Sequence, residues 1–163
     1  MHFEGDIRDL DSLKSVFYDV KPEIVIHMAA QPIVRDSYKE PVYTYDVNVM
    51  GTVNDLECVR MIDSVKSFVN VTTDKVYLNR ELNIPFKEAE ELCVFDPFSN
   101  SKSSSELLTY SYKNSFFGGE SGKRSDGRAV SISTCCAGNV IDGGDFANDR
   151  IIPDCVRAIG AGE

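Results

Sequence analysis

The stretch EIVIHM, residues 23–28, decides the fold class that we expect for this chain of 163 residues. It follows Pro22, has the length of one strand and is rich in β-branched residues. Such a run predicts a strand that is buried on both faces of a sheet. SFVNVTT at residues 67–73 predicts a second buried strand, and AVSISTC at residues 129–135 predicts a third strand.

Segments with helical periodicity separate these strands. Residues 10–20 have apolar side chains at helical spacing, with Asp9 or Asp11 as a candidate N-cap. A second apolar stripe runs from Val42 to about Met61, and a third covers residues 108–116 after several small serines. Strand, helix, strand, helix, strand with crossovers of this length predicts an α/β fold, with a parallel sheet and helices on both faces.

Ligands of such sheets bind beyond the carboxyl ends of the strands. Three segments occupy these positions, namely AAQP at residues 29–32, TTDK at 72–75 and CAGN at 136–139. Each is small or polar where an apolar strand ends, a pattern that strand ends also show when no site is present. The sequence therefore places a candidate site at this edge of the sheet.

Composition narrows the class of partner. The formal net charge of -9 argues against nucleic acid or an anionic membrane surface. No apolar run is long enough to span a bilayer, and MHFEGDIRDL at the amino terminus lacks the basic and apolar regions of a signal peptide. We expect a cytoplasmic protein.

The cysteines are odd in number and form no CxxC pair, which predicts reduced and mostly buried thiols. A metal site would need clustered ligands, and His2 and His27 are the chain's histidines, so we expect no metal. The cysteines are Cys58, Cys93, Cys135, Cys136 and Cys155.

Two further motifs are interpreted as chance matches. Asn70-Val71-Thr72 has the spacing of a glycosylation acceptor but lies inside an apolar run. GESGK at residues 119–123 resembles a phosphate-binding loop, but it lacks the first glycine and precedes a strand instead of following one. We interpret that segment as the tip of a solvated loop.

Six segments together resemble the extended short-chain dehydrogenase/reductase superfamily. They are GDIRD at residues 5–9, HMAAQP at 27–32, NVMGT at 48–52, VTTDKVY at 71–77, DPFSNSK at 96–102 and AGNVIDGGD at 137–145. Within the superfamily, AAQPIVRDSYKEP, TTDK and AGNVIDGGD followed by DRIIPD most resemble CDP-glucose 4,6-dehydratases. The resemblance implies NAD as cofactor and a nucleotide sugar, CDP-glucose or a related one, as substrate.

The resemblance also assigns binding roles. Asp6 would hydrogen-bond the adenine, although a turn-forming aspartate is the plainer interpretation. Asn48 would reach the cofactor from the long helix, or would make a structural hydrogen bond, and both interpretations stay open. The full set implied for the cofactor is Asp6, Ile7, Ala29, Ala30, Gln31, Asn48, Thr72 and Lys102, and the set implied for the substrate is Gln31, Asn139 and Arg150.

The implied chemistry is an internal oxidation and reduction, in which NAD takes a hydride from C4 of the hexose, water leaves across C5 and C6, and the hydride returns to C6. Thr73 would hydrogen-bond the C4 oxygen, Asp74 would protonate the departing hydroxyl, and Lys75 would take part in proton transfer at C5. A loop with an exposed lysine is the plain alternative for these three residues.

Two positions depart from the pattern. Relatives have a catalytic tyrosine at the position of Phe98, and Lys102, one helical turn later, would bind the nicotinamide ribose. Phe98 keeps the aromatic ring and loses the proton acceptor. Relatives also usually carry an arginine at the position of Cys136.

The resemblance further implies that residues 1–163 are one incomplete, partial Rossmann-like, doubly wound domain. It would lack the first βαβ units, with their glycine-rich pyrophosphate loop, and most of the C-terminal substrate domain. We therefore expect weak NAD binding by the chain alone, and self-association through an exposed apolar edge at EIVIHM.

Three hypotheses about function stay open at this point. The chain is a CDP-glucose 4,6-dehydratase-like protein, inactive in this form because of Phe98 and the absent loop; or it is a non-catalytic fragment or interaction module; or it belongs to another nucleotide-sugar epimerase or dehydratase.

Overall fold

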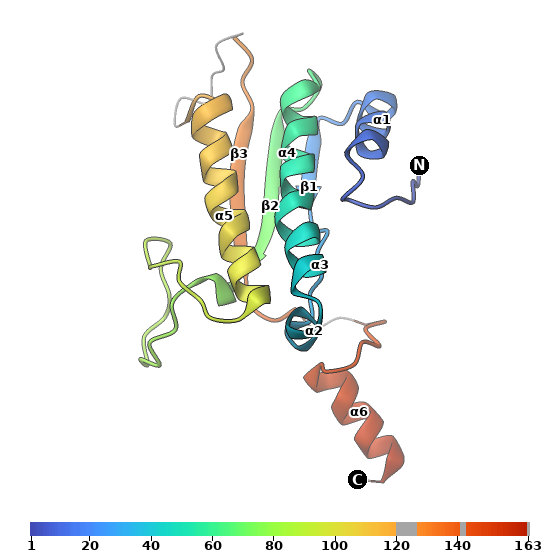
Figure 1. The fold of residues 1–163 in the computed structure, drawn as a ribbon, viewed down its shortest axis with the longest axis vertical. Coiled ribbons are helices and arrows are strands. Elements are labelled where there is room, and N and C mark those ends of the chain that lie inside the picture. The colour runs from blue at the N-terminus through green and yellow to red at the C-terminus, as the bar shows by residue number, and fades with distance from the viewer. Residues whose placement is uncertain (120–126, 141–142, 163) are drawn as a thin grey trace.

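A sheet of three parallel strands forms the centre of the molecule (Figure 1). The computed structural model describes residues 1–119, 127–140 and 143–162. The strands are β1 (Ile24–His27), β2 (Ser67–Thr73) and β3 (Ser131–Ala137), in the order β1-β2-β3. Ile24 pairs with Ser67, and Ser67 pairs with Ser131. The expected α/β class with a parallel sheet is confirmed.

The helices lie close to their expected positions. Residues 10–20 form a helix capped by Asp9, whose carboxylate accepts a hydrogen bond from the Ser12 N–H at 3.0 Å. The long helix expected up to Met61 is a continuous run of three parts, with a π-helical turn in the middle. The helices are α1 (Leu10–Val20), α2 (Val34–Lys39), α3 (Pro41–Tyr45), η1 (Asp46–Met50), α4 (Gly51–Met61), η2 (Asp74–Val76), α5 (Pro97–Phe116) and α6 (Ile151–Ala161).

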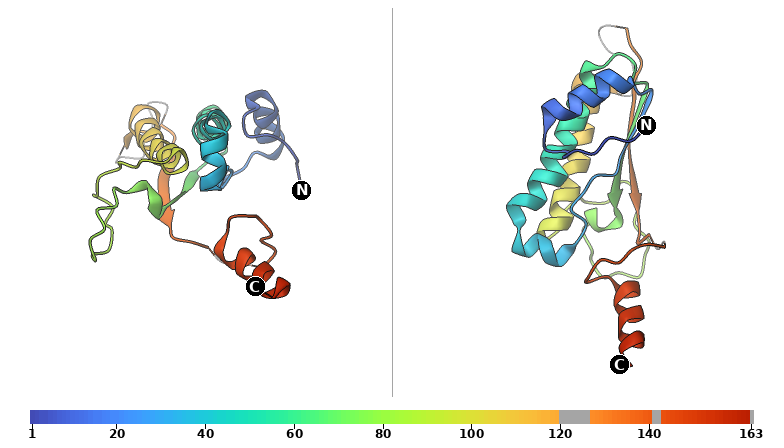
Figure 2. Two further views of the ribbon diagram at one scale, coloured as in Figure 1. Left: turned by 60° about the horizontal axis from the view of Figure 1, so that its bottom comes forward. Right: turned by 90° about the vertical axis from the view of Figure 1, so that its right-hand side faces the viewer.

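In the described residues, the helices that pack on the sheet cover one face, not two as expected (Figure 2). The physical reason is the strand order. The strands lie in the sheet in the same order as in the chain, so each new strand is added on the same side of the previous one. Right-handed crossovers then place every connecting helix on the same face of the sheet. The expectation that EIVIHM is buried on both faces is therefore wrong, since Ile24 and Ile26 are 67% and 60% exposed.

The interior changes character along the strands. Near their amino ends, Phe68 of β2 and Ile132 of β3 pack against helices α1, α4 and α5 in an apolar core. Toward the carboxyl ends, the side chains beneath the helices are polar, including His27, Asn70 and Thr72. This second half of the interior holds the helices in register at the edge where a ligand would bind. The core comprises Phe17, Leu56, Cys58, Val59, Ile62, Val65, Phe68, Phe117, Val130 and Ile132.

The prediction that the cysteines are mostly buried is wrong. Cys58 is buried, and the other four thiols are exposed, while their reduced state stays a prediction. Burial raises the pKa of the Cys58 thiol to about 12. Asn70 is fully buried, which agrees with setting aside its glycosylation motif. The GESGK motif falls largely on residues outside those that the structure describes.

Candidate functional site

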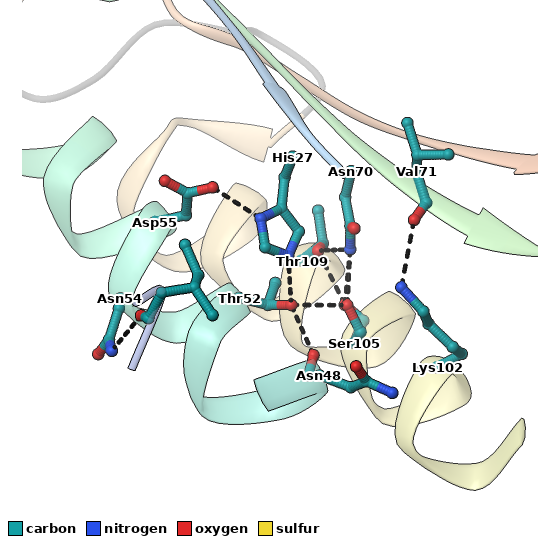
Figure 3. Close-up of polar contacts among 11 residues, drawn as sticks. His27, Asn48, Thr52, Asn54, Asp55, Asn70, Val71, Lys102, Ser105 and Thr109 are labelled. Atoms are coloured by element: carbon teal, nitrogen blue, oxygen red, sulfur yellow. Dashed lines mark hydrogen bonds and ion pairs between the residues drawn. The ribbon is translucent and has the colours of Figure 1, made fainter. Parts of the chain in front are cut away.

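A buried polar network joins β1 and β2 to helices α4 and α5 (Figure 3). His27 lies at its centre, 2% exposed, with Nδ1 2.7 Å from Asp55 Oδ2 and Nε2 3.1 Å from Thr52 Oγ1. Thr52 also contacts Ser105 Oγ at 3.0 Å, so one hydroxyl connects both helices. Hydrogen bonds inside a low-dielectric interior are strong and directional, and this network therefore fixes how α4 and α5 sit over the strand ends.

Asn48 performs a related task in the π-helical turn. It is fully buried; its Oδ1 accepts from the Gln31 N–H at 2.8 Å, and its Nδ2 donates to Gln31 O at 3.2 Å and to Ser101 Oγ at 2.9 Å. The side-chain oxygen and nitrogen of Asn48 are thus both hydrogen-bonded within the protein. This is the structural role that the sequence allowed as one of two interpretations. A contact with the cofactor stays a prediction.

The start of α5 presents Phe98 and Lys102 from one side of the helix. Asp96 caps the helix by accepting from the Ser99 N–H at 2.9 Å, and the Phe98 N–H donates to Ser37 Oγ at 3.1 Å. Ser101 Oγ donates to Phe98 O at 2.6 Å, which links this turn to Asn48. The aromatic ring of Phe98 is buried and has no polar atom.

Lys102 is the most unusual charged group of the site. Its residue is only 5% exposed, and among the described residues its Nζ has one long contact, 3.5 Å to Val71 O (Figure 3). Burial lowers the pKa of Lys102, while the negative charge of Glu106 raises it in part. A buried ammonium with so few acceptors has N–H groups left over for a ligand hydroxyl.

The turn after β2 brings together three of the expected catalytic residues. Thr73 Oγ1 donates to Asp74 Oδ1 at 3.1 Å, and Lys75 Nζ lies 3.4 Å from the same oxygen. Lys75 Nζ also donates to Asn139 Oδ1 at 3.1 Å, from the loop that follows β3. The short helix η2 follows β2 directly, so the chain leaves the extended conformation at Asp74, where a strand would place successive side chains on opposite faces.

A second cluster surrounds Thr72 beside this turn. The Thr72 hydroxyl donates to Glu106 Oε1, and the Cys136 thiol donates to the same carboxylate oxygen at 3.1 Å. Tyr77 OH lies 3.6 Å from Cys136 Sγ. Cys136 is exposed as a residue, but partial burial of its thiol and the hydrogen bond to Glu106 raise the thiol pKa, so the residue that replaces the expected arginine is uncharged.

At the amino terminus, Asp6 pairs with the nearby Arg8, and Ile7 packs against the long helix. The Arg8 guanidinium binds the Asp6 carboxylate, with the closest contact at 2.6 Å, and lowers the pKa of Asp6 to about 2. Ile7 packs so closely on Gly51 that an added Cβ would lie 2.8 Å from Ile7 Cγ2. This contact explains the glycine of the NVMGT segment.

Other predicted residues lie apart from these clusters. Ala29 is exposed and Ala30 half-buried in the turn after β1. Arg150 lies 3.5 Å from Asp145, and its buried Nε has no hydrogen-bond partner in the described residues. An open hollow of about 330 Å³ lies between α5 and β3 and shares Glu106 and Thr109 with the clusters and the polar network of Figure 3; its lining is Glu88, Leu92, Glu106, Leu107, Thr109, Tyr110, Lys113, Ile132, Ser133 and Thr134.

Several residues of the site were not predicted. Ser101 follows Phe98 by three residues on α5, and Glu106 follows Lys102 by four, so each lies on the same side of the helix as the residue that it follows. His27 is a polar residue inside an otherwise apolar segment, which is the signal that could have found it, whereas Asp55 lies beside polar Asn54 and carries no such signal. The structure is needed to show that they contact each other.

Comparisons with known proteins agree with this arrangement. The family described as "GDP-mannose 4,6 dehydratase" matches residues 1–117. CDP-glucose 4,6-dehydratase of Salmonella typhimurium is 47% identical over 94% of this chain and 42% of its own length. A dTDP-glucose 4,6-dehydratase from Streptomyces venezuelae, solved with NAD bound, superposes with a TM-score of 0.76 at 26% identity, over 97% of this chain and 44% of its own.

A more distant similarity extends to an epimerase. UDP-glucose 4-epimerase of Thermotoga maritima, solved with UDP-glucose, superposes with a TM-score of 0.65 at 26% identity, over 69% of this chain and 37% of its own. The chain thus spans less than half the length of each of these three proteins. In the described residues, no helix is both long and apolar enough to cross a membrane.

Proposed function

Because this chain belongs to the GDP-mannose 4,6 dehydratase family of nucleotide-sugar enzymes, we propose that it is CDP-glucose 4,6-dehydratase-like and that Phe98 impairs its turnover. The reaction would remove water from a nucleotide-linked hexose and leave a 4-keto-6-deoxy sugar. The 47% identity to a CDP-glucose 4,6-dehydratase over 94% of this chain is the observation that carries the proposal. The clusters at the strand ends supply groups suited to that chemistry.

The surroundings of Lys102 fit a dinucleotide. The Lys102 ammonium is almost fully buried and, in the part of the chain that the structure describes, has a single contact at 3.5 Å, so it is suited to binding ribose hydroxyls. The small side chains of Ala29 and Ala30 leave the backbone open at the end of β1. When bound, NAD would supply the acceptor for a hydride from C4 and return it to C6.

The turn after β2 provides the groups for loss of water. Thr73 would donate a hydrogen bond to the C4 oxygen and orient it. Asp74 would give a proton to the departing C6 hydroxyl, and Lys75, 3.4 Å from Asp74, would take part in moving the C5 proton. Asn139 holds the Lys75 ammonium at 3.1 Å and thereby fixes its direction.

Phe98 leaves one step of this scheme, the oxidation at C4, without its proton acceptor. Oxidation at C4 needs a group that accepts the hydroxyl proton, and a phenylalanine ring has none. Loss of a positioned general base costs typically ~10²–10⁴-fold in rate. The fold of this turn does not depend on the missing hydroxyl, because Asp96, Ser37 and Ser101 hold it through the backbone.

Nucleotide selectivity tests the proposal. Because the relatives are longer, the remaining segments of the Salmonella CDP-glucose 4,6-dehydratase would be joined to this chain, and binding would be measured by calorimetry with NAD present. We expect CDP-glucose to bind at least 10-fold more tightly than UDP-glucose or GDP-mannose, which corresponds to about 1.4 kcal/mol. Equal binding of all three, or none, by a folded chimera would contradict the assignment.

A further inference from the structure

Glu106 is an acidic residue that the proposed chemistry does not use, yet the protein holds it firmly. It lies four residues after Lys102 on α5, so the two side chains share one side of the helix. Both side chains reach the end of β2, where Lys102 Nζ contacts Val71 O at 3.5 Å and Thr72 donates to Glu106. Cys136 of β3 adds a second donor to the same carboxylate oxygen at 3.1 Å.

Lys102 needs a negative charge nearby if it is to keep its proton. A buried ammonium loses the stabilisation that water gives to its charge. In the described part of the chain, Lys102 has no carboxylate within ion-pair distance, and Phe98 provides no hydroxyl that could become a phenolate. Among the charged groups, Glu106 is the one whose field acts on Lys102 and opposes the effect of burial on its pKa.

The other acidic residues on elements packed against α5 already have basic partners. Asp74 of η2 pairs with Lys75 at 3.4 Å, and Asp55 of α4 binds His27 at 2.7 Å. Glu106 has no basic partner within ion-pair distance in the residues that the structure describes. The remaining acids pair as Asp36 with Lys39, Asp46 with Arg8 and Glu57 with Arg60. The tyrosines and cysteines on these elements are Tyr38, Tyr43, Tyr45, Cys58, Cys135 and Cys136.

We propose that Glu106 is a positioning residue, whose carboxylate, fixed by Thr72 and Cys136 one helical turn after Lys102, keeps the buried Lys102 ammonium charged at the end of β2. The inference rests on the proposed function, in which Lys102 faces the cofactor. It also gives Cys136 a role. An uncharged thiol at this position leaves the Glu106 charge free to act on Lys102, whereas a guanidinium beside Glu106 would neutralise it.

The test is a titration of Lys102 by NMR in the chain labelled with ¹⁵N- and ¹³C-lysine, with the signal assigned by its loss in Lys102→Arg. We expect Glu106→Gln to shift the titration of Lys102 to lower pH, because glutamine keeps the hydrogen bond from Thr72 and removes the charge. Cys136→Arg should shift it in the same direction. Glu88→Gln is the matched control, since Glu88 lines the same hollow but bonds to neither Thr72 nor Cys136, and it should leave Lys102 unchanged.

Lys102 titrating at the same pH in Glu106→Gln as in the unaltered chain, with circular dichroism showing the same fold, would overturn the proposal. If Glu106→Gln unfolds, Cys136→Arg decides, and an unchanged titration there overturns it equally. The measurement needs no substrate, so its result is independent of whether the proposed dehydratase activity is correct.

Discussion

Where α5 begins, an aromatic ring without a hydroxyl lies one helical turn before an ammonium that is almost fully buried. Phe98 and Lys102 thus have the spacing of the proposed catalytic pair, and Phe98 lacks the hydroxyl that the proposed chemistry needs. The contacts that hold the turn are backbone contacts to Asp96, Ser37 and Ser101. A substitution of the Phe98 side chain therefore changes whether a proton acceptor is present and leaves these hydrogen bonds in place.

Gly51 is a single residue whose role in packing is testable. We expect Gly51→Ala to lower the free energy of unfolding by about 1–3 kcal/mol, because the new methyl group would lie 2.8 Å from Ile7 Cγ2 and 3.1 Å from Ile7 Cγ1. Urea denaturation measures the change. Gly160→Ala in α6 is the control, since no atom lies within 4 Å of its added Cβ. Equal stability of both variants would mean that Ile7 is free to move aside.

At the scale of elements, the π-helical turn η1 exists where Asn48 reaches two distant partners. We expect Asn48→Leu to cost about 2 kcal/mol or more in unfolding free energy, because it leaves the buried Gln31 N–H and Ser101 hydroxyl without this partner. Chemical denaturation with the exposed Asn114→Leu as control measures the difference. Similar small losses in both variants would contradict the account of the network.

Local patterns explain which elements could be predicted from the sequence. The helix at residues 10–20 and the strand at 67–73 have the expected bounds, because their periodicity and their limits are local. The third strand begins two residues later than expected, at Ser131, since pairing with β2 and not apolar character sets its start. The π-helical turn was not predicted, because it depends on contacts between residues 17 and 53 positions apart.

At the scale of the whole molecule, the topology leaves one face of the sheet without helices in the described residues. Ile24, Ile26 and Met28 point toward that face and are 67%, 60% and 71% exposed. β1 also pairs with β2 alone among the described strands, so its other edge presents unpaired backbone groups. A surface of this kind favours association with another polypeptide.

Self-association is therefore the expected behaviour of the isolated chain. Light scattering after size-exclusion chromatography should give a mass that rises with concentration, and Ile26→Thr should reduce the rise because it removes apolar surface from the open face. Val42→Thr is a suitable control, because Val42 is 82% exposed on α3, away from the sheet. A monomer at all concentrations would show that the open face does not drive association.

The central claim, a nucleotide-sugar dehydratase site that lacks its proton acceptor at Phe98, is tested most directly by restoring the hydroxyl. The measurement compares the chimera with the Salmonella enzyme's remaining segments, carrying either Phe98 or Phe98→Tyr, for conversion of CDP-glucose to the 4-keto-6-deoxy product. We expect the tyrosine form to be faster by on the order of 10²-fold or more, with little change in stability, because the ring is the same size. Equal rates in the two forms, or no product from a folded tyrosine form, would contradict the claim.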